Sequence, residues 1–142
     1  MGRPRIHGSD QLLDAAAEIA AAGGPAALSM AGVAKATGAP SGSVYHLFPT
    51  RASLLGELWL RSIRAFQAGY LEELSGEDPV QSCIDAGTFV ITWSRENQRE
   101  ARIFLHGSRE FGATDWPDEL KGRILSVQDD LEKGLNAAAG RL

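Results

Sequence analysis

The stretch LSMAGVAKATGAPSGSVYHLF constrains the fold of this chain more than any other segment. Two short runs of helical periodicity lie there, each preceded by a serine and separated by a glycine. Ser29 is a good N-cap for a helix over 30–37, which Gly38 ends. Ser41 is expected to cap the next helix, over 42–48. This spacing predicts a helix-turn-helix unit, in which the second helix is held outward from the domain.

Helical periodicity continues along the rest of the chain, and residues that favour strands are sparse. Ser9 or Asp10 is expected to cap the first helix, on which the acidic row of Asp10, Asp14 and Glu18 is expected to be a solvated face. Helices are expected over residues 10–22, 51–74, 79–93, 98–106 and 117–135, with Thr50 and Asp78 as N-caps. The sequence therefore predicts an all-α fold of two parts. These are a helix-turn-helix domain at 1–55, with a flexible arm at 1–8, and a helix bundle at 56–142.

Composition and charge narrow the classes of function. The chain has 142 residues and a net charge of −4. Four Lys and Arg against three Asp and Glu give residues 1–55 a net charge of +1, and ten against fifteen give residues 56–142 a net charge of −5. No apolar run approaches the roughly 18 residues that a membrane span needs. The single cysteine, Cys83, allows no intrachain disulfide, and as a buried thiol it would suit a reducing cytoplasm.

The helix expected over 42–48 carries side chains that are suited to contact DNA. Val44 and Leu47 are expected to face inward, toward Leu28 and Val33, whereas Ser41, Gly42, Ser43 and His46 are expected to face outward. Small and hydroxyl-bearing residues let a helix approach base edges closely and form hydrogen bonds there. Phosphate contacts are expected from the phenol of Tyr45 and from the helix N-termini at Ser29 and Ser41. The cationic residues expected at DNA are Lys35, Arg51, and Arg3 and Arg5 of the arm.

Each of these residues also has a structural interpretation. Ser-Gly-Ser is an ordinary turn or cap sequence. Tyr45 and His46 are equally compatible with a satisfied pair in the core, and Arg51 with an exposed charge. The arm is equally compatible with an unstructured terminus.

The segment SMAGVAKATGAPSGSVYHLFPTRASLL resembles the N-terminal domain of TetR-type (TetR/AcrR) transcriptional regulators. The resemblance covers about residues 3–60 and implies an all-helical homodimer that binds a palindromic operator and leaves it when a small molecule occupies the second domain. It also implies that Ser29 and Tyr45 bind phosphate and that Ser41, Gly42 and Ser43 face the groove. Arg51 stands where the family usually has lysine, and Leu47 where many members have a histidine. Family members usually continue beyond this length by about two helices that form the dimer interface.

Aromatic residues are unusually frequent in the second part of the chain. At helical spacing they are compatible with a packed core, or with the wall of a cavity for an apolar or aromatic ligand between helices of the bundle. The residues expected to line such a cavity are Trp59, Phe66, Tyr70, Phe89, Trp93, Phe104, His106 and Gln128, with Asn97 as a further polar candidate.

The sequence favours a ligand-responsive repressor that acts on double-stranded operator DNA in the cytoplasm as a homodimer. One alternative is a small-molecule binding protein of the same fold that has lost operator binding. An enzyme is a second alternative, but no G-x-S-x-G, H-E-x-x-H, Walker or C-x-x-C motif occurs. We therefore expect no catalytic residues, no metal, no cofactor and no membrane partner.

Overall fold

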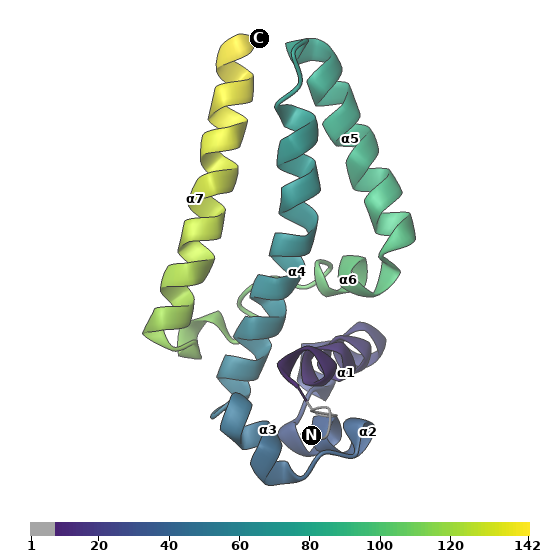
Figure 1. Ribbon diagram of the computed structural model, residues 1–142, viewed down its shortest axis with the longest axis vertical. Coiled ribbons are helices and arrows are strands. Elements are labelled where there is room, and N and C mark those ends of the chain that lie inside the picture. Colours follow the sequence, from purple (N-terminus) through teal and green to yellow (C-terminus); the bar gives the residue numbers. More distant parts are fainter. Residues whose placement is uncertain (1–7) are drawn as a thin grey trace, which may run out of the picture.

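Helices form all the regular structure in residues 8–142, which are the residues described by the computed structural model (Figure 1). They are α1 (Ser9–Gly23), α2 (Met30–Thr37), α3 (Ser41–Leu47), α4 (Arg51–Leu74), α5 (Pro79–Glu96), α6 (Gln98–Ile103) and α7 (Asp118–Arg141), with 3₁₀ turns η1 (Pro25–Ala27) and η2 (Ala113–Asp115). The predicted all-α fold is confirmed.

Helix α4 is the axis of the molecule. Figure 1 shows α1, α2 and α3 gathered around one end of α4, while α5 and α7 flank its other half. The predicted cap is present: the Thr50 hydroxyl accepts a hydrogen bond from the backbone N–H of Ser53 at 3.0 Å, and the Ser53 hydroxyl accepts one from the N–H of Thr50 at 3.1 Å. This reciprocal capping box fixes where the long helix leaves the N-terminal unit.

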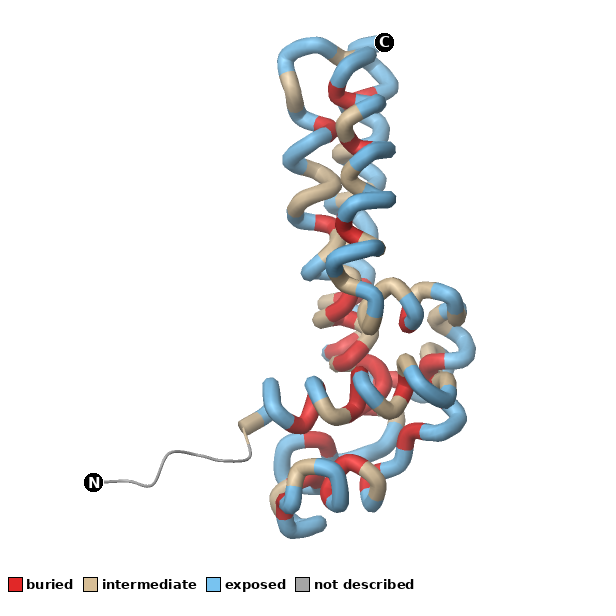
Figure 2. Tube along the Cα trace, turned by 90° about the vertical axis from the view of Figure 1, so that its right-hand side faces the viewer, coloured by how far each residue is buried: buried red, intermediate tan, exposed pale blue. Residues whose placement is uncertain are grey.

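One hydrophobic core runs from α1 to α7. It joins Leu12 and Val44 of the N-terminal unit to Leu55 of α4 and Ile124 of α7. Figure 2 shows the buried residues concentrated in the lower half of the molecule, around the junction of α4 with the N-terminal helices. Because the core crosses residue 55 without a break, the proposed units at 1–55 and 56–142 are packed together.

Close approach of α4 and α7 depends on small residues. A Cβ atom at Gly56 would overlap the side chain of Leu120, and one at Gly134 would overlap the side chain of Leu71. At the far end, the Arg141 guanidinium donates hydrogen bonds to the carbonyl oxygens of Leu74 and Gly76 at 2.5 and 2.6 Å. These carbonyls lie at and just beyond the last turn of α4, so Arg141 anchors the end of α7 to it.

Two predicted N-caps are wrong. Ser9 and Ser41 are the first residues of α1 and α3, and neither helix start has a side-chain cap hydrogen bond. Before α3 the N-cap is Pro40, with φ −60° and ψ 143°. Since proline fixes φ near this value, the chain enters the helix one residue earlier than expected.

Three further local predictions are corrected. The helix expected over 98–106 ends at Ile103, where a series of turns begins. Cys83 is exposed, because α5 packs through the face that carries Ser82, Ala86 and Trp93. The acidic row on α1 is exposed but is not merely solvated, since Asp14 forms an ion pair with Arg61 of α4 at 2.9 Å.

Candidate DNA-binding surface and ligand cavity

The turn between α2 and α3 has the predicted geometry. The Ser29 hydroxyl accepts a hydrogen bond from the N–H of Gly32 at 2.9 Å, which begins α2. Gly38 ends α2 with φ +71°, a left-handed conformation that favours glycine. Val33 and Val44 are fully buried and pack the two helices against the core. Both the cap at Ser29 and the stop at Gly38 are confirmed.

Within residues 8–142, the outer face of α3 is exposed. Ser41, Gly42, Tyr45 and His46 are exposed, and Ser43 is half-buried. Because 53% of Tyr45 is accessible, the alternative in which Tyr45 and His46 form a core pair is wrong. The helix therefore offers a surface of hydroxyl, phenol and imidazole groups.

Leu47 does not face the core as predicted. It is 38% exposed, and Phe48, only 4% exposed, is buried instead. The reason is that α3 ends at Leu47 and Phe48 adopts an extended conformation with φ −129° and ψ 91°. The chain turns there and directs Phe48 into the core, which leaves an apolar side chain on the outer surface of the unit.

The cationic residues predicted to contact DNA differ in their surroundings. Lys35 is exposed in the last turn of α2. Arg51, in contrast, donates hydrogen bonds from Nε to the carbonyl oxygen of Leu28 and from Nη2 to that of Pro25, both at 2.8 Å. The position of Arg51 thus has an explanation within the domain and does not require a phosphate. Arg3 and Arg5 lie outside the described residues.

A cavity of about 370 Å³ lies between α4, α5, α6 and α7. Three aromatic rings that meet at its wall belong to Phe66, Trp93 and Phe104. The ring centroids of Phe66 and Trp93 are 5.2 Å apart, and those of Phe66 and Phe104 are 6.0 Å apart, both in edge-to-face arrangement. The other lining residues are Ile63, Gln67, Val90, Ser94, Ala101 and Leu131.

The other predicted cavity residues lie elsewhere. The rings of Tyr70, Phe89 and Trp59 contact the lining rings but do not line the cavity themselves. The ring centroids of Tyr70 and Phe89 lie 5.4 and 5.7 Å from that of Phe66. The centroid of Trp59 lies 5.9 Å from that of Phe104. His106 is bonded to Glu110 in the turns after α6, and Gln128 is exposed on α7. Asn97 donates a hydrogen bond to the carbonyl oxygen of Trp93 at the end of α5. The expected polar contacts from His106 and Gln128 are therefore absent from the lining.

Among the lining residues that the sequence does not predict, Gln67 has the most distinctive contact. Its side chain is buried, at 8% exposure, and its Nε2 atom donates a hydrogen bond to the carbonyl oxygen of Val127 on α7 at 2.7 Å. A signal was present in the sequence, because Leu60, Gln67 and Leu74 recur every seven residues on one face of α4. A glutamine in the middle of such an apolar face indicates a buried polar contact.

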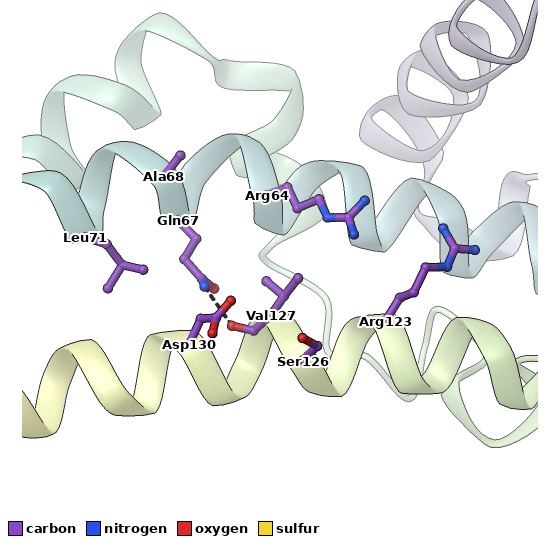
Figure 3. A pocket seen from close by; sticks show the side chains of 8 residues that line it. All are labelled: Arg64, Gln67, Ala68, Leu71, Arg123, Ser126, Val127 and Asp130. Carbon is purple, nitrogen blue, oxygen red and sulfur yellow. Dashed lines mark hydrogen bonds between the residues drawn. The ribbon is translucent and has the colours of Figure 1, made fainter.

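A second, polar groove of about 360 Å³ is lined by both residues of this contact (Figure 3). Arg64 and Arg123 extend into it from α4 and α7, together with Ser126 and Asp130. Arg123 is paired with Glu57, and its Nε lies 2.8 Å from the Oε1 atom of Glu119. Gln67 lines both the groove and the aromatic cavity.

Residues 8–142 contain no helix long and apolar enough to cross a membrane. In the same part of the chain, no three His, Cys, Asp or Glu side chains are grouped so that they would hold a metal ion.

Comparison with known proteins agrees with this geometry. Residues 12–58 match the family model described as bacterial regulatory proteins of the tetR family. No curated protein matches the chain.

Two solved structures share the fold along nearly the whole chain. One is the TetR family transcriptional regulator PfmR from Thermus thermophilus, with a TM-score of 0.76 at 22% identity, over 95% of this chain and 70% of that one. Another is a putative tetR family transcription regulator from Shewanella sp. PV-4, with a TM-score of 0.75 at 18% identity, over 93% of this chain and 70% of that one.

The fold and the α2–α3 geometry define an all-α protein with an N-terminal helix-turn-helix unit. More specifically, residues 12–58 match the tetR family model, and the chain shares its fold with the two solved TetR family structures.

Proposed function

We propose that this protein is a transcription repressor that binds a palindromic operator as a homodimer. The observation that carries the proposal is the exposed face of α3, where residues 8–142 leave hydroxyl, phenol and imidazole groups accessible. Ser41, Gly42, Ser43 and His46 read base edges, and Ser29, Lys35 and Tyr45 contact phosphates. Arg3 and Arg5 reach the minor groove, and Arg51 adds positive charge beside the phosphates. Such a repressor acts in the cytoplasm, with half-sites about one helical turn apart.

A small apolar or aromatic molecule in the cavity would release the operator. Helix α4 supports this mechanism, because it begins beside α3 and carries Phe66 and Gln67 of the cavity wall in the same continuous helix. A ligand that fits better when the two recognition helices are further apart shifts the population away from DNA. Residues 1–55 form the DNA-binding unit and residues 56–142 the ligand-binding and pairing unit in this scheme.

A second candidate function is ligand binding without operator binding. Two observations favour it: Leu47 places an apolar side chain on the outer surface of the unit, and Arg51 is bonded to backbone carbonyls. No recognition-helix residue is Arg or Lys, so the commonest strong base contact is missing from α3.

Solution mass and DNA selection together separate the two candidates. We expect light scattering to show a dimer of the 142-residue chain, and selection from a pool of random duplexes to enrich a palindrome. A chain that enriches no sequence, and binds duplexes without salt dependence, would contradict the repressor and favour the binding protein.

A further inference from the structure

Two large hydrophobic side chains are exposed in residues 8–55, and both lie on α3. They are Tyr45, at 53% exposure, and Leu47, at 38%. The other large hydrophobic side chains of these residues are buried or half-buried, and Val44 of the same helix is fully buried. Tyr45 carries a phenol that the proposed function directs to a phosphate. Leu47 has no polar side-chain atom, so any contact that its side chain makes with DNA is apolar.

The exposure of Leu47 has a local cause in the sequence. A proline disfavours the helical conformation of the residue before it, and Pro49 follows Phe48. Phe48 is accordingly extended, so α3 ends at Leu47, and the aromatic ring enters the core in place of the leucine. Single exposed leucines are common on protein surfaces, so the neighbours of Leu47 decide what it can contact.

Leu47 lies next to a residue that the proposed function assigns to base edges. Ser43 precedes it by four positions in α3, and side chains four positions apart are neighbours on one side of a helix. The rise along the helix between the two residues is about 6 Å. Successive base pairs are about 3.4 Å apart, so the two side chains reach positions within about two base pairs of each other.

The base edges in the major groove offer one apolar group. It is the 5-methyl group of thymine, whereas the other edge groups are hydrogen-bond donors and acceptors. A leucine side chain is suited to this methyl group, because their contact removes apolar surface of both from water. The deoxyribose is also partly apolar, but it is the same in every nucleotide and carries no sequence information.

We propose that Leu47 contacts the 5-methyl group of one thymine in each half-site and thereby determines specificity at that base pair. The inference rests on the proposed function, since it requires α3 to lie in the major groove. It adds a residue that selects thymine by an apolar contact, within about two base pairs of the position that Ser43 reads. The contact distinguishes thymine from cytosine, whose edge presents an amino group and no methyl group.

Replacement of thymine by deoxyuridine tests the contact, because deoxyuridine lacks only the 5-methyl group. The operator is first selected from random duplexes with the unchanged chain, and each of its thymines is then replaced in turn. We expect one thymine in each half-site whose replacement weakens binding about fourfold, and about 15-fold when both half-sites are changed. Fluorescence anisotropy with labelled duplexes measures the dissociation constants.

Three variants assign the effect to one residue. Leu47→Ala removes most of the apolar contact and should bind the thymine and deoxyuridine duplexes alike. Leu47→Met keeps a similar side-chain volume and should keep the preference for thymine. Leu125→Ala changes a leucine of α7 that is 57% exposed, and it should leave both affinity and preference unchanged. The melting temperatures of all three variants should match that of the unchanged chain, because the substituted residues are at the surface.

The outcomes separate this inference from the proposed function. Enrichment of a palindrome in which no deoxyuridine replacement weakens binding would overturn the contact with a methyl group and leave the repressor in place. A methyl effect that persists in Leu47→Ala would belong to another residue and would likewise overturn the inference. Enrichment of no sequence at all would contradict the proposed function, and the role of Leu47 with it.

Discussion

Arg99 of α6 and Glu18 of α1 lie 3.3 Å apart, between Nη1 and Oε1, although 81 positions separate them in the sequence. Arg99 also approaches Asp14 at 3.6 Å, and Asp14 in turn pairs with Arg61 of α4. Two members of the acidic row on α1 thus form ion pairs with arginine side chains from the second part of the chain. These ion pairs link the DNA-binding unit to α6, which also carries Ala101 of the cavity wall.

Arg99→Gln should weaken this link measurably but not unfold the protein. The side chains of Arg99 and Glu18 are 31% and 72% exposed, so solvent screens the pair, and we expect a loss of about 0.5–1 kcal/mol in the free energy of unfolding. Urea denaturation at low and high salt measures it, and the loss should shrink at high salt. Arg102→Gln, on the same helix, is the matched control. An equal loss in both variants would contradict a specific contribution from Arg99.

Arg51→Gln should destabilise the N-terminal unit whether or not DNA is present. The variant loses the two hydrogen bonds to Pro25 and Leu28 that hold η1 and the following residue against α4. We expect the free energy of unfolding to fall by about 1–2 kcal/mol, after allowance for exposure. Thermal melting checks the prediction. An unchanged melting temperature together with weaker DNA binding would show that Arg51 contacts a DNA phosphate instead.

Salt dependence of DNA binding should report the number of phosphate contacts. If Arg3, Arg5, Lys35 and Arg51 each neutralise one phosphate, a dimer releases about eight counterions, and log K falls against log salt with a slope of about −7. Lys35→Gln should reduce the magnitude of that slope by about 2, because the residue occurs twice in the dimer. Fluorescence anisotropy with a labelled duplex measures both. A slope shallower than about −3 would remove most of these contacts.

Substitutions on α3 should separate affinity from sequence preference. Tyr45→Phe removes the phenol oxygen expected at a phosphate, so binding to all duplexes should weaken alike, by about 1 kcal/mol. His46→Ala removes a side chain expected at base edges and should change which sequences are enriched. Competition binding with the selected and scrambled duplexes checks both. Identical effects of the two variants on every sequence would contradict this division.

The contribution of Glu110 to stability should disappear in acid. A hydrogen bond with His106 Nδ1, at 2.8 Å, lowers the pKa of Glu110 below its ordinary value of 4.5. The carboxylate therefore stabilises the fold above pH 4.5, and this contribution is lost as the pH falls through the lowered pKa. The difference in unfolding free energy between the unchanged chain and Glu110→Gln should shrink below pH 4.5. A difference that stays constant between about pH 6 and about pH 3 would be inconsistent with this link.

Much of the fold follows from local sequence signals. Some helix boundaries depend on residues whose contacts are with neighbouring backbone groups, so the sequence alone locates them. These residues are the N-caps Ser29, Thr50 and Asp78 and the C-cap Gly38. The exposed face of α3 also follows from helical periodicity.

The errors come from contacts that periodicity does not encode. Leu47 has the right spacing to face inward, but the helix ends at that residue and Phe48 is buried instead. His106 and Gln128 are candidates by their chemistry alone, whereas Gln67 reaches the cavity because α7 packs across α4. The partners of Arg51 and Arg99 are likewise distant in sequence, and tertiary packing alone brings them together.

The unbroken core between α1 and α7 has a consequence for unfolding. Domains with separate cores melt in separate steps, whereas a shared core makes the loss of one part expose apolar surface of the other. The recognition helix should therefore melt as one cooperative unit with the parts of α4 and α7 that share this core, against which Ile63 of the cavity wall packs. A molecule that binds far along the chain from α3 would then raise the melting temperature of the DNA-binding helices by mass action, even before any change of shape.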